Sequence, residues 1–524
     1  MKIEDLNFGN IEGKDEFDLS NGIFKNSIDD VFFLDKKINY ESFLKGEKSY
    51  IYGHKGTGKT SLLKYLEYKA DKEKNKTISI LFKDIKNNTL IYSTFLKLLG
   101  SVHDKNRASK AFWQWFILSI IIKENNIETT EDNLIFYTKN TLFSKLSTFL
   151  TKIINVKYKY QSANHELEIG TNFSDLKIDE NNDLFNAGIK IDILQNLIQK
   201  NLKDKFYIFI DELETSKMSE NYFQDSILIK NLIIMVNSIN KLSENIFITL
   251  AVRTEVLNNI FSAGDEINKL LESKGICIQW EYDKYSITHP LIQIILKKIR
   301  YSMKNNSNIN IINKSITLSD KEIFDYWFEE ELVEGIYNSE QVLLNNTWLK
   351  PRDIIRLMNI LQKEAFYSQK FNKSFFKEAI KKYSDASWDE IQEELVSILD
   401  KDEILSIIKT LTNYESEFSY IELKARIIRN SNFDHPQTEK IIDAMYDTGI
   451  IGNKFLDETG FLTYKYSFRG NRYIDKNVGI EVHKGLWECF TISKKLTRNK
   501  NSSNNENNDD DNTSELAELL HKLK

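Results

Sequence analysis

The sequence predicts an α/β fold in which helices cover both faces of a parallel sheet, followed by a helical lid and a C-terminal winged-helix domain. Apolar runs such as "TISILF", "FYIFID" and "NIFITLAV" alternate with segments of helical spacing, and strands that are apolar throughout are typical of parallel sheets buried on both faces. After about Ile276 the strand pattern stops and helical segments dominate. Residues 412–495 then follow the order helix, helix, two short strands, which predicts the winged helix.

These patterns divide the chain into segments. A lead-in, residues 1–46, is expected to pack on the sheet domain of residues 47–275, which carries a helical insert at about 87–175 with a hairpin at 156–170. The helical lid spans 276–400 and the winged helix 401–495. Residues 496–524 are polar and expected to be disordered, apart from a short terminal helix with a leucine stripe at Leu516, Leu519, Leu520 and Leu523.

Composition excludes several classes of protein. A net charge of -6 argues against coating nucleic acid or anionic membrane through bulk charge. The two cysteines, Cys277 and Cys489, lack CxxC spacing, so we expect no zinc site or disulfide framework and a reducing, cytoplasmic location. No apolar leader is recognised, and the most apolar run, residues 111–122, is too short to span a bilayer and is expected to form a buried helix.

The strongest motif is "GHKGTGKT", residues 53–60, which matches G-x-x-x-x-G-K-[ST] in full between a strand and a helix. Its glycines let backbone N–H groups approach phosphate oxygens, and the helix directs its positive end at the same charge. Lys59 is expected to contact the β- and γ-phosphates and Thr60 to coordinate Mg²⁺. The alternative is a glycine-rich turn that matches by chance. The residues expected to hold the nucleotide are Gly53, His54, Lys55, Gly56, Thr57, Gly58, Lys59, Thr60 and Ser61.

A second motif ends the strand "FYIFIDELE". Asp211 is expected at the carboxyl edge of the sheet, where it would hold Mg²⁺ through water, and Glu212 would polarise the attacking water. The alternative is an acidic turn that only caps a helix. Glu214 is most simply a surface residue.

Arginines complete the predicted site. Arg253 ends the strand of "LAVRTEV" and is expected to sense the γ-phosphate, the alternative being a surface pair with Glu255. Arg352 follows Pro351 at a helix start and is expected to reach the nucleotide from the lid, with Arg356 one turn later; the alternative is a solvated face. No guanine-reading N-K-x-D motif follows the strands, which favours ATP with Mg²⁺.

The motifs "GHKGTGKT", "IFIDELE", "LAVRTE" and "KPRDIIRL", followed by a winged helix, resemble the AAA+/STAND side of the P-loop ATPases. More narrowly the chain resembles bacterial FunZ-type and KAP-like ATPases of anti-phage defence loci, a likeness to which "GNIEGKDEF" and "EVHKGLWECF" add and which covers most of residues 1–495. The resemblance implies Walker A roles for Lys59 and Thr60 and Walker B roles for Asp211 and Glu212. It also implies a sensor at Arg253 and a lid sensor at Arg352, whereas it identifies no arginine finger beyond a guess at Arg300 and no motif in the hairpin insert.

The predicted function is a nucleotide-controlled switch. We expect the chain to form homo-oligomers when it binds ATP and to engage a separately encoded effector protein. We expect no contact with a membrane. A DNA-remodelling AAA+ ATPase is the alternative, and a scaffold that binds ATP without turnover is a third hypothesis. DNA contact is not favoured, because the candidate recognition helix exposes Glu439, Asp443 and Asp447 against Lys440, so phosphate neutralisation is lacking.

Overall fold

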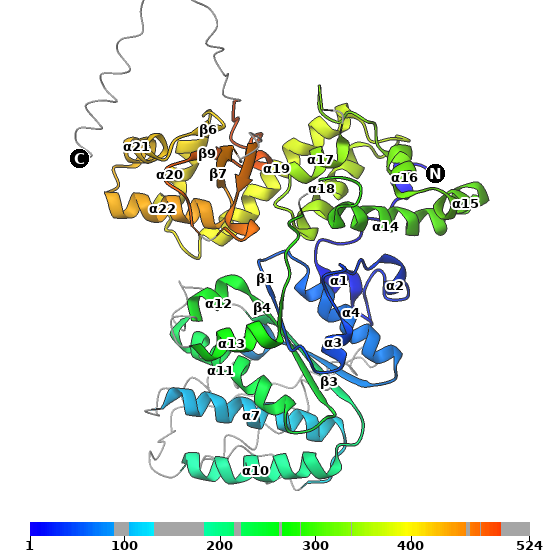
Figure 1. Ribbon diagram of the computed structural model, residues 1–524, viewed down its shortest axis with the longest axis vertical. Coiled ribbons are helices and arrows are strands. Elements are labelled where there is room, and N and C mark those ends of the chain that lie inside the picture. The colour runs from blue at the N-terminus through cyan, green and yellow to red at the C-terminus, as the bar shows by residue number, and fades with distance from the viewer. Residues whose placement is uncertain are drawn as a thin grey trace, which may run out of the picture. The chain divides into compact units, whose positions relative to one another are not determined.

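The computed structural model describes residues 1–87, 104–129, 183–213, 222–260, 265–282, 285–336, 338–456, 462–471 and 473–493 (Figure 1). The predicted hairpin at 156–170, Glu214 and the tail with its leucine stripe lie outside these residues. The chain forms two compact units. One is Gly9–Gln279, and the other combines Met1–Phe8 with Trp280–Lys524.

A parallel five-stranded sheet forms the centre of the first unit, as the sequence predicts. The strand order is β2-β3-β4-β1-β5, so β4 separates the strand before the glycine-rich loop from the strand that carries Asp211. The short β5 is not predicted, because three residues are too few to display a period. The strands are β1 (Tyr50–Gly53), β2 (Lys76–Leu81), β3 (Phe206–Leu213), β4 (Ile246–Arg253) and β5 (Gly275–Cys277).

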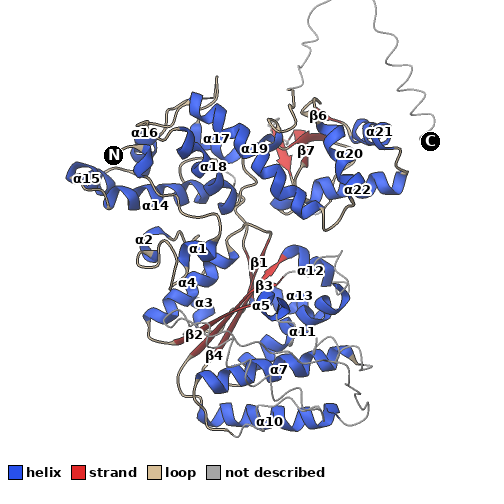
Figure 2. Ribbon diagram, turned by 180° about the vertical axis from the view of Figure 1, so that it is seen from behind, coloured by secondary structure: helices blue, strands red, loops and turns tan. Residues whose placement is uncertain are grey.

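Helices cover both faces of this sheet (Figure 2). Side chains along β3 alternate between the faces: Ile208 and Ile210 join the apolar core formed with α7 and α11, whereas the Tyr207 hydroxyl donates to the Leu44 carbonyl of α3 at 3.0 Å on the other side. The helices are α1 (Gly13–Phe17), α2 (Ile28–Val31), α3 (Glu41–Leu44), α4 (Lys59–Lys72), α5 (Phe82–Asn87), α7 (Lys105–Glu124), α10 (Asp183–Asn201), α11 (Tyr222–Asn240), α12 (Thr254–Ile260) and α13 (Asp265–Lys274).

The apolar run at 111–122 lies within α7 and is buried, as predicted. Trp113 and Phe116 are fully enclosed, and the Trp113 indole N–H donates to the Leu228 carbonyl of α11 at 2.9 Å. A buried indole needs such an acceptor, so the run is a core helix. Among the described helices, none combines the length and the apolar character that crossing a membrane requires.

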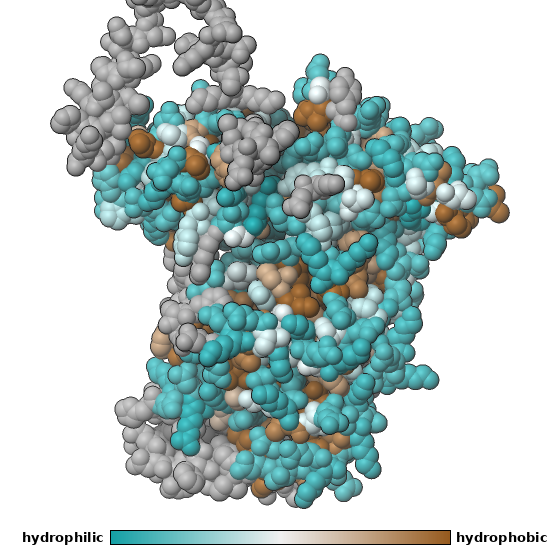
Figure 3. All heavy atoms as spheres, viewed as in Figure 1, coloured by the Kyte–Doolittle hydropathy of each residue, from teal (hydrophilic) through white to brown (hydrophobic). Residues whose placement is uncertain are grey.

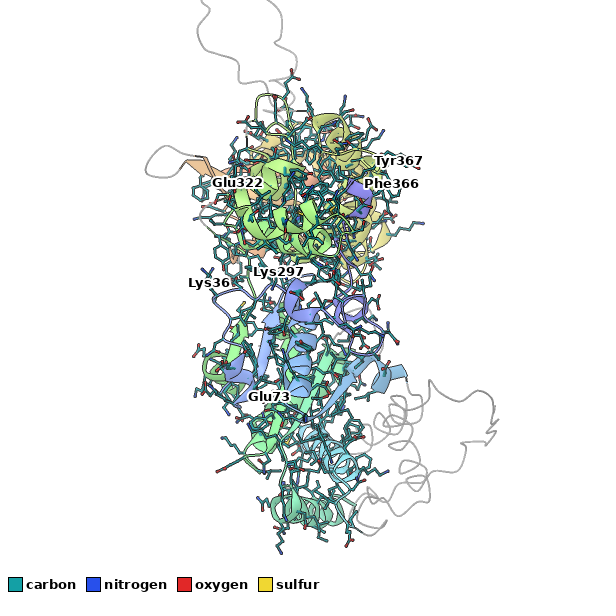
Figure 4. The ribbon with its side chains drawn as sticks, turned by 90° about the vertical axis from the view of Figure 1, so that its right-hand side faces the viewer. Lys36, Glu73, Lys297, Glu322, Phe366 and Tyr367 are labelled. Carbon is teal, nitrogen blue, oxygen red and sulfur yellow. The ribbon has the colours of Figure 1, made fainter. Side chains whose placement is uncertain are left out.

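The second unit begins with a helical part. Its helices are α14 (Pro290–Lys304), α15 (Ile309–Thr317), α16 (Asp320–Trp327), α17 (Ser339–Asn345), α18 (Pro351–Glu364) and α19 (Lys373–Leu395). Glu322, labelled in Figure 4, closes a capping box with Ser319 at the start of α16. In Figure 3 an apolar area lies over α15, where Ile309 and Ile316 are 69% and 67% exposed.

The first eight residues belong to this second unit, which corrects the assignment of the whole lead-in to the sheet domain. The Gln362 side-chain amide donates to the carbonyls of Ile3 and Leu6 at 2.9 and 2.6 Å, and Ile3 and Phe8 are buried. Phe366 and Tyr367, which project together in Figure 4, form an edge-to-face pair in the same region. Buried apolar side chains and these hydrogen bonds therefore hold the start of the chain on α18.

Among its described residues, the C-terminal part contains three α-helices and a four-stranded antiparallel sheet of order β6-β9-β7-β8. The two predicted strands correspond to β7 and β8, whereas β6 and β9 are additional, because strands of two and four residues give little sequence signal. The elements are α20 (Lys401–Leu411), β6 (Glu417–Phe418), α21 (Tyr420–Ser431), α22 (His435–Asp447), β7 (Ile451–Leu456), β8 (Leu462–Lys465) and β9 (Gly479–Val482).

A buried carboxyl group makes the stability of this part depend on pH. Burial raises the pKa of Glu481 to about 7, a shift that Lys484 and Lys454 oppose and that Glu417, its direct partner across the strands, increases. The folded chain therefore keeps a proton that the unfolded chain loses near its ordinary pKa of 4.5. Stability should be fully present below that value and fall by on the order of 1 kcal/mol per pH unit as pH rises toward 7.

The measurement is urea unfolding at several pH values between 4.5 and 7. Glu481→Gln should remove this fall in stability, because the amide is neutral throughout. Glu488→Gln, which changes an exposed glutamate nearby, should keep it. An unchanged pH dependence in Glu481→Gln would contradict the assignment to Glu481.

Candidate functional site

The glycine-rich loop joins β1 to α4 and requires its glycines. Gly56 and Gly58 have φ angles of 81° and 90°, in the left-handed region that favours glycine. A Cβ atom on Gly53 would lie 2.9 Å from the carbonyl oxygen of Ile278 and 2.9 Å from Oγ1 of Thr57. The backbone is thus packed too closely at this turn for a side chain.

Lys59 begins α4 and its ammonium group lies in the curve of the loop. Its Nζ donates to the carbonyl oxygens of Gly53 and His54 at 3.0 and 2.8 Å, and the residue is only 8% exposed. The Thr57 hydroxyl donates to the same His54 carbonyl at 2.8 Å. A positive charge therefore sits among backbone groups at the amino end of a helix, where an anion is favoured.

The two predicted Mg²⁺ ligands lie side by side. The Thr60 hydroxyl donates to Oδ2 of Asp211 at 2.6 Å, although Asp211 follows Thr60 by 151 positions in the chain. Asp211 is 9% exposed, on the strand two places from β1 in the sheet. A hydroxyl and a carboxylate oxygen are donors that Mg²⁺ prefers, so these residues fit the ion together with phosphate oxygens.

Glu212 occupies a strained backbone position at a bulge. Its φ angle is 58°, which is uncommon for a residue with a side chain, and the register of β3 against β4 shifts between Ile210 and Leu213. The Glu212 N–H donates to Oδ1 of Asp211 at 2.7 Å. Such a bulge redirects the side chain, and here Oε1 of Glu212 lies 3.7 Å from Nζ of Lys14.

Arg253 lies beside the loop, because the β1–β4 register pairs it with Gly53. Glu255, considered above as its surface partner, bonds His54 of the loop at 2.8 Å from Nδ1. The partial burial of Glu255 would raise its pKa, but this hydrogen bond and the nearby charge of Lys59 lower it to about 2. Glu255 therefore ties the loop to the start of α12, next to Arg253.

Arg352 belongs to the second unit and is not among the residues that the first unit assembles. It follows Pro351 at the start of α18, as predicted, and its Nη1 donates to Oε1 of Glu390 on α19 at 2.9 Å. Arg356 pairs with the same carboxylate. The role of Arg352 as a nucleotide sensor stays a prediction.

Arg300, the guess at an arginine finger, is bound within the second unit. Its guanidinium donates to the carbonyls of Ser315 and Leu318 and to Asp320, at 2.7, 2.9 and 2.7 Å. These bonds join α14 to the end of α15, the connecting residue Leu318 and the start of α16. A structural role accounts for them.

Two charged residues beside the predicted ones were missed from sequence. Lys14 lies in "GNIEGKDEF", a stretch to which the sequence assigns no chemical role, and Glu390 lies among other acids on α19. Only the folded structure therefore indicates their partners.

Comparison with known proteins gives distant structural likeness only. No protein-family model and no curated protein matches the sequence significantly. The ORC2 protein of Aeropyrum pernix, solved in ADPNP and ADP complexes, is similar at a TM-score of 0.38 and 12% identity, over 85% of this chain and 90% of that one. The Aeropyrum pernix ORC1 protein, solved in complex with DNA, is similar at a TM-score of 0.34 and 12% identity, over 86% of this chain and 90% of that one. At these values the function must be inferred from the residues of this chain.

Proposed function

We propose that this chain binds Mg·ATP at the glycine-rich loop and hydrolyses it. The observation that carries the proposal is the 2.6 Å hydrogen bond between Thr60 and Asp211, because it joins two motifs that are each expected to hold Mg²⁺. The buried ammonium group of Lys59, at the start of α4, supports it.

In this proposal the phosphates lie against the N–H groups of residues 53–61, with Lys59 beside the β- and γ-phosphates. Bound Mg²⁺ would neutralise phosphate charge, with Thr60 as a ligand and Asp211 acting through water. Arg253, paired in register with Gly53, is suited to stabilise charge on the transferring group. The lid sensor Arg352 would have to exchange Glu390 for phosphate.

Glu212 is the proposed general base. It would accept a proton from a water molecule that attacks the γ-phosphorus, while the bond between this phosphorus and the β–γ bridging oxygen breaks and leaves ADP and phosphate. The strained backbone at Glu212 supports this role, because such strain is concentrated at functional sites.

We propose that ATP turnover makes the protein a switch in anti-phage defence. This part of the proposal rests on the resemblance to ATPases of anti-phage defence loci. ATP binding would close the lid, reposition the C-terminal part and assemble cytoplasmic homo-oligomers that engage a separate effector protein; hydrolysis would reset them. The charges of α22 do not favour the DNA-remodelling alternative, because Lys440, its one lysine, pairs with Glu403 at 2.7 Å. Glu439 there already pairs with Lys424 and Lys476, at 3.0 and 3.5 Å, and these lysines are the cations such a surface would need.

Solution mass with and without Mg·ATP tests the switch. Glu212→Gln should form a larger assembly with ATP, because it binds ATP without hydrolysing it. Lys59→Ala should keep its small mass, because it binds ATP poorly. A mass independent of nucleotide in the wild type and both variants would contradict assembly. Turnover stimulated by DNA would then favour the alternative.

A further inference from the structure

We propose that Lys14 is a positioning residue for hydrolysis, holding the carboxylate of Glu212 beside the first turn of α4. This inference rests on the proposed function, in which Glu212 is the general base. The observation is the ion pair between the Lys14 ammonium and Oε1 of Glu212, 3.7 Å apart. It links the lead-in to the end of β3.

The segment that carries Lys14 is placed by close packing on α4. A Cβ atom on Gly13 would lie 2.2 Å from Oγ and 3.1 Å from the backbone nitrogen of Ser61, the residue after Thr60. The amino end of α1 therefore rests directly on the first turn of the helix that leaves the glycine-rich loop. This contact places the next residue, Lys14, at the same level as the proposed phosphate and metal ligands.

Further contacts hold the rest of the lead-in on α4. Asp18 accepts from Lys64 at 3.0 Å, and Asp29 binds Lys69 and Lys72. Hydrogen bonds and lysine charges at both acids outweigh burial and lower the pKa of each carboxyl well below its usual range. The Phe32 ring stacks on Tyr65 with centroids 4.3 Å apart. Lys14 is thus attached to a segment fixed at three places along the helix.

Glu212 needs such a restraint because its backbone does not determine the orientation of its long side chain. The bulge and the N–H bond to Asp211 fix the backbone only, and the side chain is 23% exposed. A carboxylate that takes a proton in the reaction must lie within hydrogen-bond reach of the attacking water. Lys14 supplies an attraction that confines this carboxylate next to α4.

The test is steady-state hydrolysis and ATP binding by Lys14→Met. We expect kcat to fall by about fivefold, since a partly exposed ion pair stabilises one geometry only modestly, while Kd for ATP stays unchanged. Lys14→Arg should retain activity and Lys14→Glu should lose more than Lys14→Met. Lys25→Met, which removes a lead-in lysine bonded to the Ser20 carbonyl, is the matched control and should not change kcat.

Combination with Glu212→Gln shows whether Lys14 acts through Glu212. Lys14→Met should cause no further loss in that background, because the two residues act as one unit. An unchanged or higher kcat in Lys14→Met, or a loss that persists in Glu212→Gln, would overturn the role of Lys14 alone. If Glu212→Gln itself left kcat unchanged, or if the wild type released no phosphate, both this inference and the proposed function would fail.

Discussion

Glu212→Gln should lower kcat for ATP hydrolysis by about 10²- to 10⁴-fold, which is the usual contribution of a general base. The amide retains the size of the side chain but accepts no proton. Kd for ATP should stay near the wild-type value, because the loop, Lys59, Thr60 and Asp211 are unchanged. Single-turnover phosphate release and equilibrium ATP binding measure the two quantities separately.

Glu73→Gln is the matched control for this substitution. Glu73 caps the opposite end of α4 from the loop, as Figure 4 shows, and its side chain accepts a hydrogen bond from Asn75. The kcat of the Glu73→Gln variant should equal that of the wild type. A Glu212→Gln variant that hydrolyses ATP at the wild-type rate would exclude Glu212 as the base.

Lys59→Ala should weaken ATP binding. Hydrogen bonds to charged groups contribute about 1.5–3 kcal/mol, and every 1.4 kcal/mol is about tenfold in affinity, so we expect Kd to rise by about 10- to 100-fold. The rate of hydrolysis at low ATP concentration should fall, because less of the protein has ATP bound. Equilibrium binding by calorimetry measures this change directly.

The control for charge removal on the same helix is Lys72→Ala. Lys72 is at the far end of α4, paired with Asp29 at the surface, and its loss should leave Kd for ATP unchanged. Equal affinity of Lys59→Ala and the wild type would contradict the placement of the phosphates in the loop.

The sheet could be predicted because its longer strands are apolar throughout. Of the two eight-residue strands, β3 carries Asp211 and Glu212 close to its carboxyl end and β4 ends in Arg253, which also locates Asp211 and Arg253 at one edge of the sheet. The short strands β5, β6 and β9 could not be predicted, because they are stabilised by pairing with neighbours rather than by a pattern of their own.

Contacts between residues far apart in the sequence could not be predicted either. The motif identifies Thr60 and Asp211 separately, but their hydrogen bond depends on the strand order. Glu255 bonds His54 rather than serving only as a neighbour of Arg253, and Lys14 reaches Glu212 because Gly13 packs on Ser61. Such partners follow from tertiary packing and leave no local sequence signal.

Release of phosphate from ATP by the purified wild-type chain, with Mg²⁺ or with EDTA, tests the central claim most directly. We predict release that requires Mg²⁺ and is lost in Asp211→Asn and in Glu212→Gln. Tight binding of ATP without any phosphate release, or release that is unaffected by EDTA and by both substitutions, would contradict hydrolysis at this site.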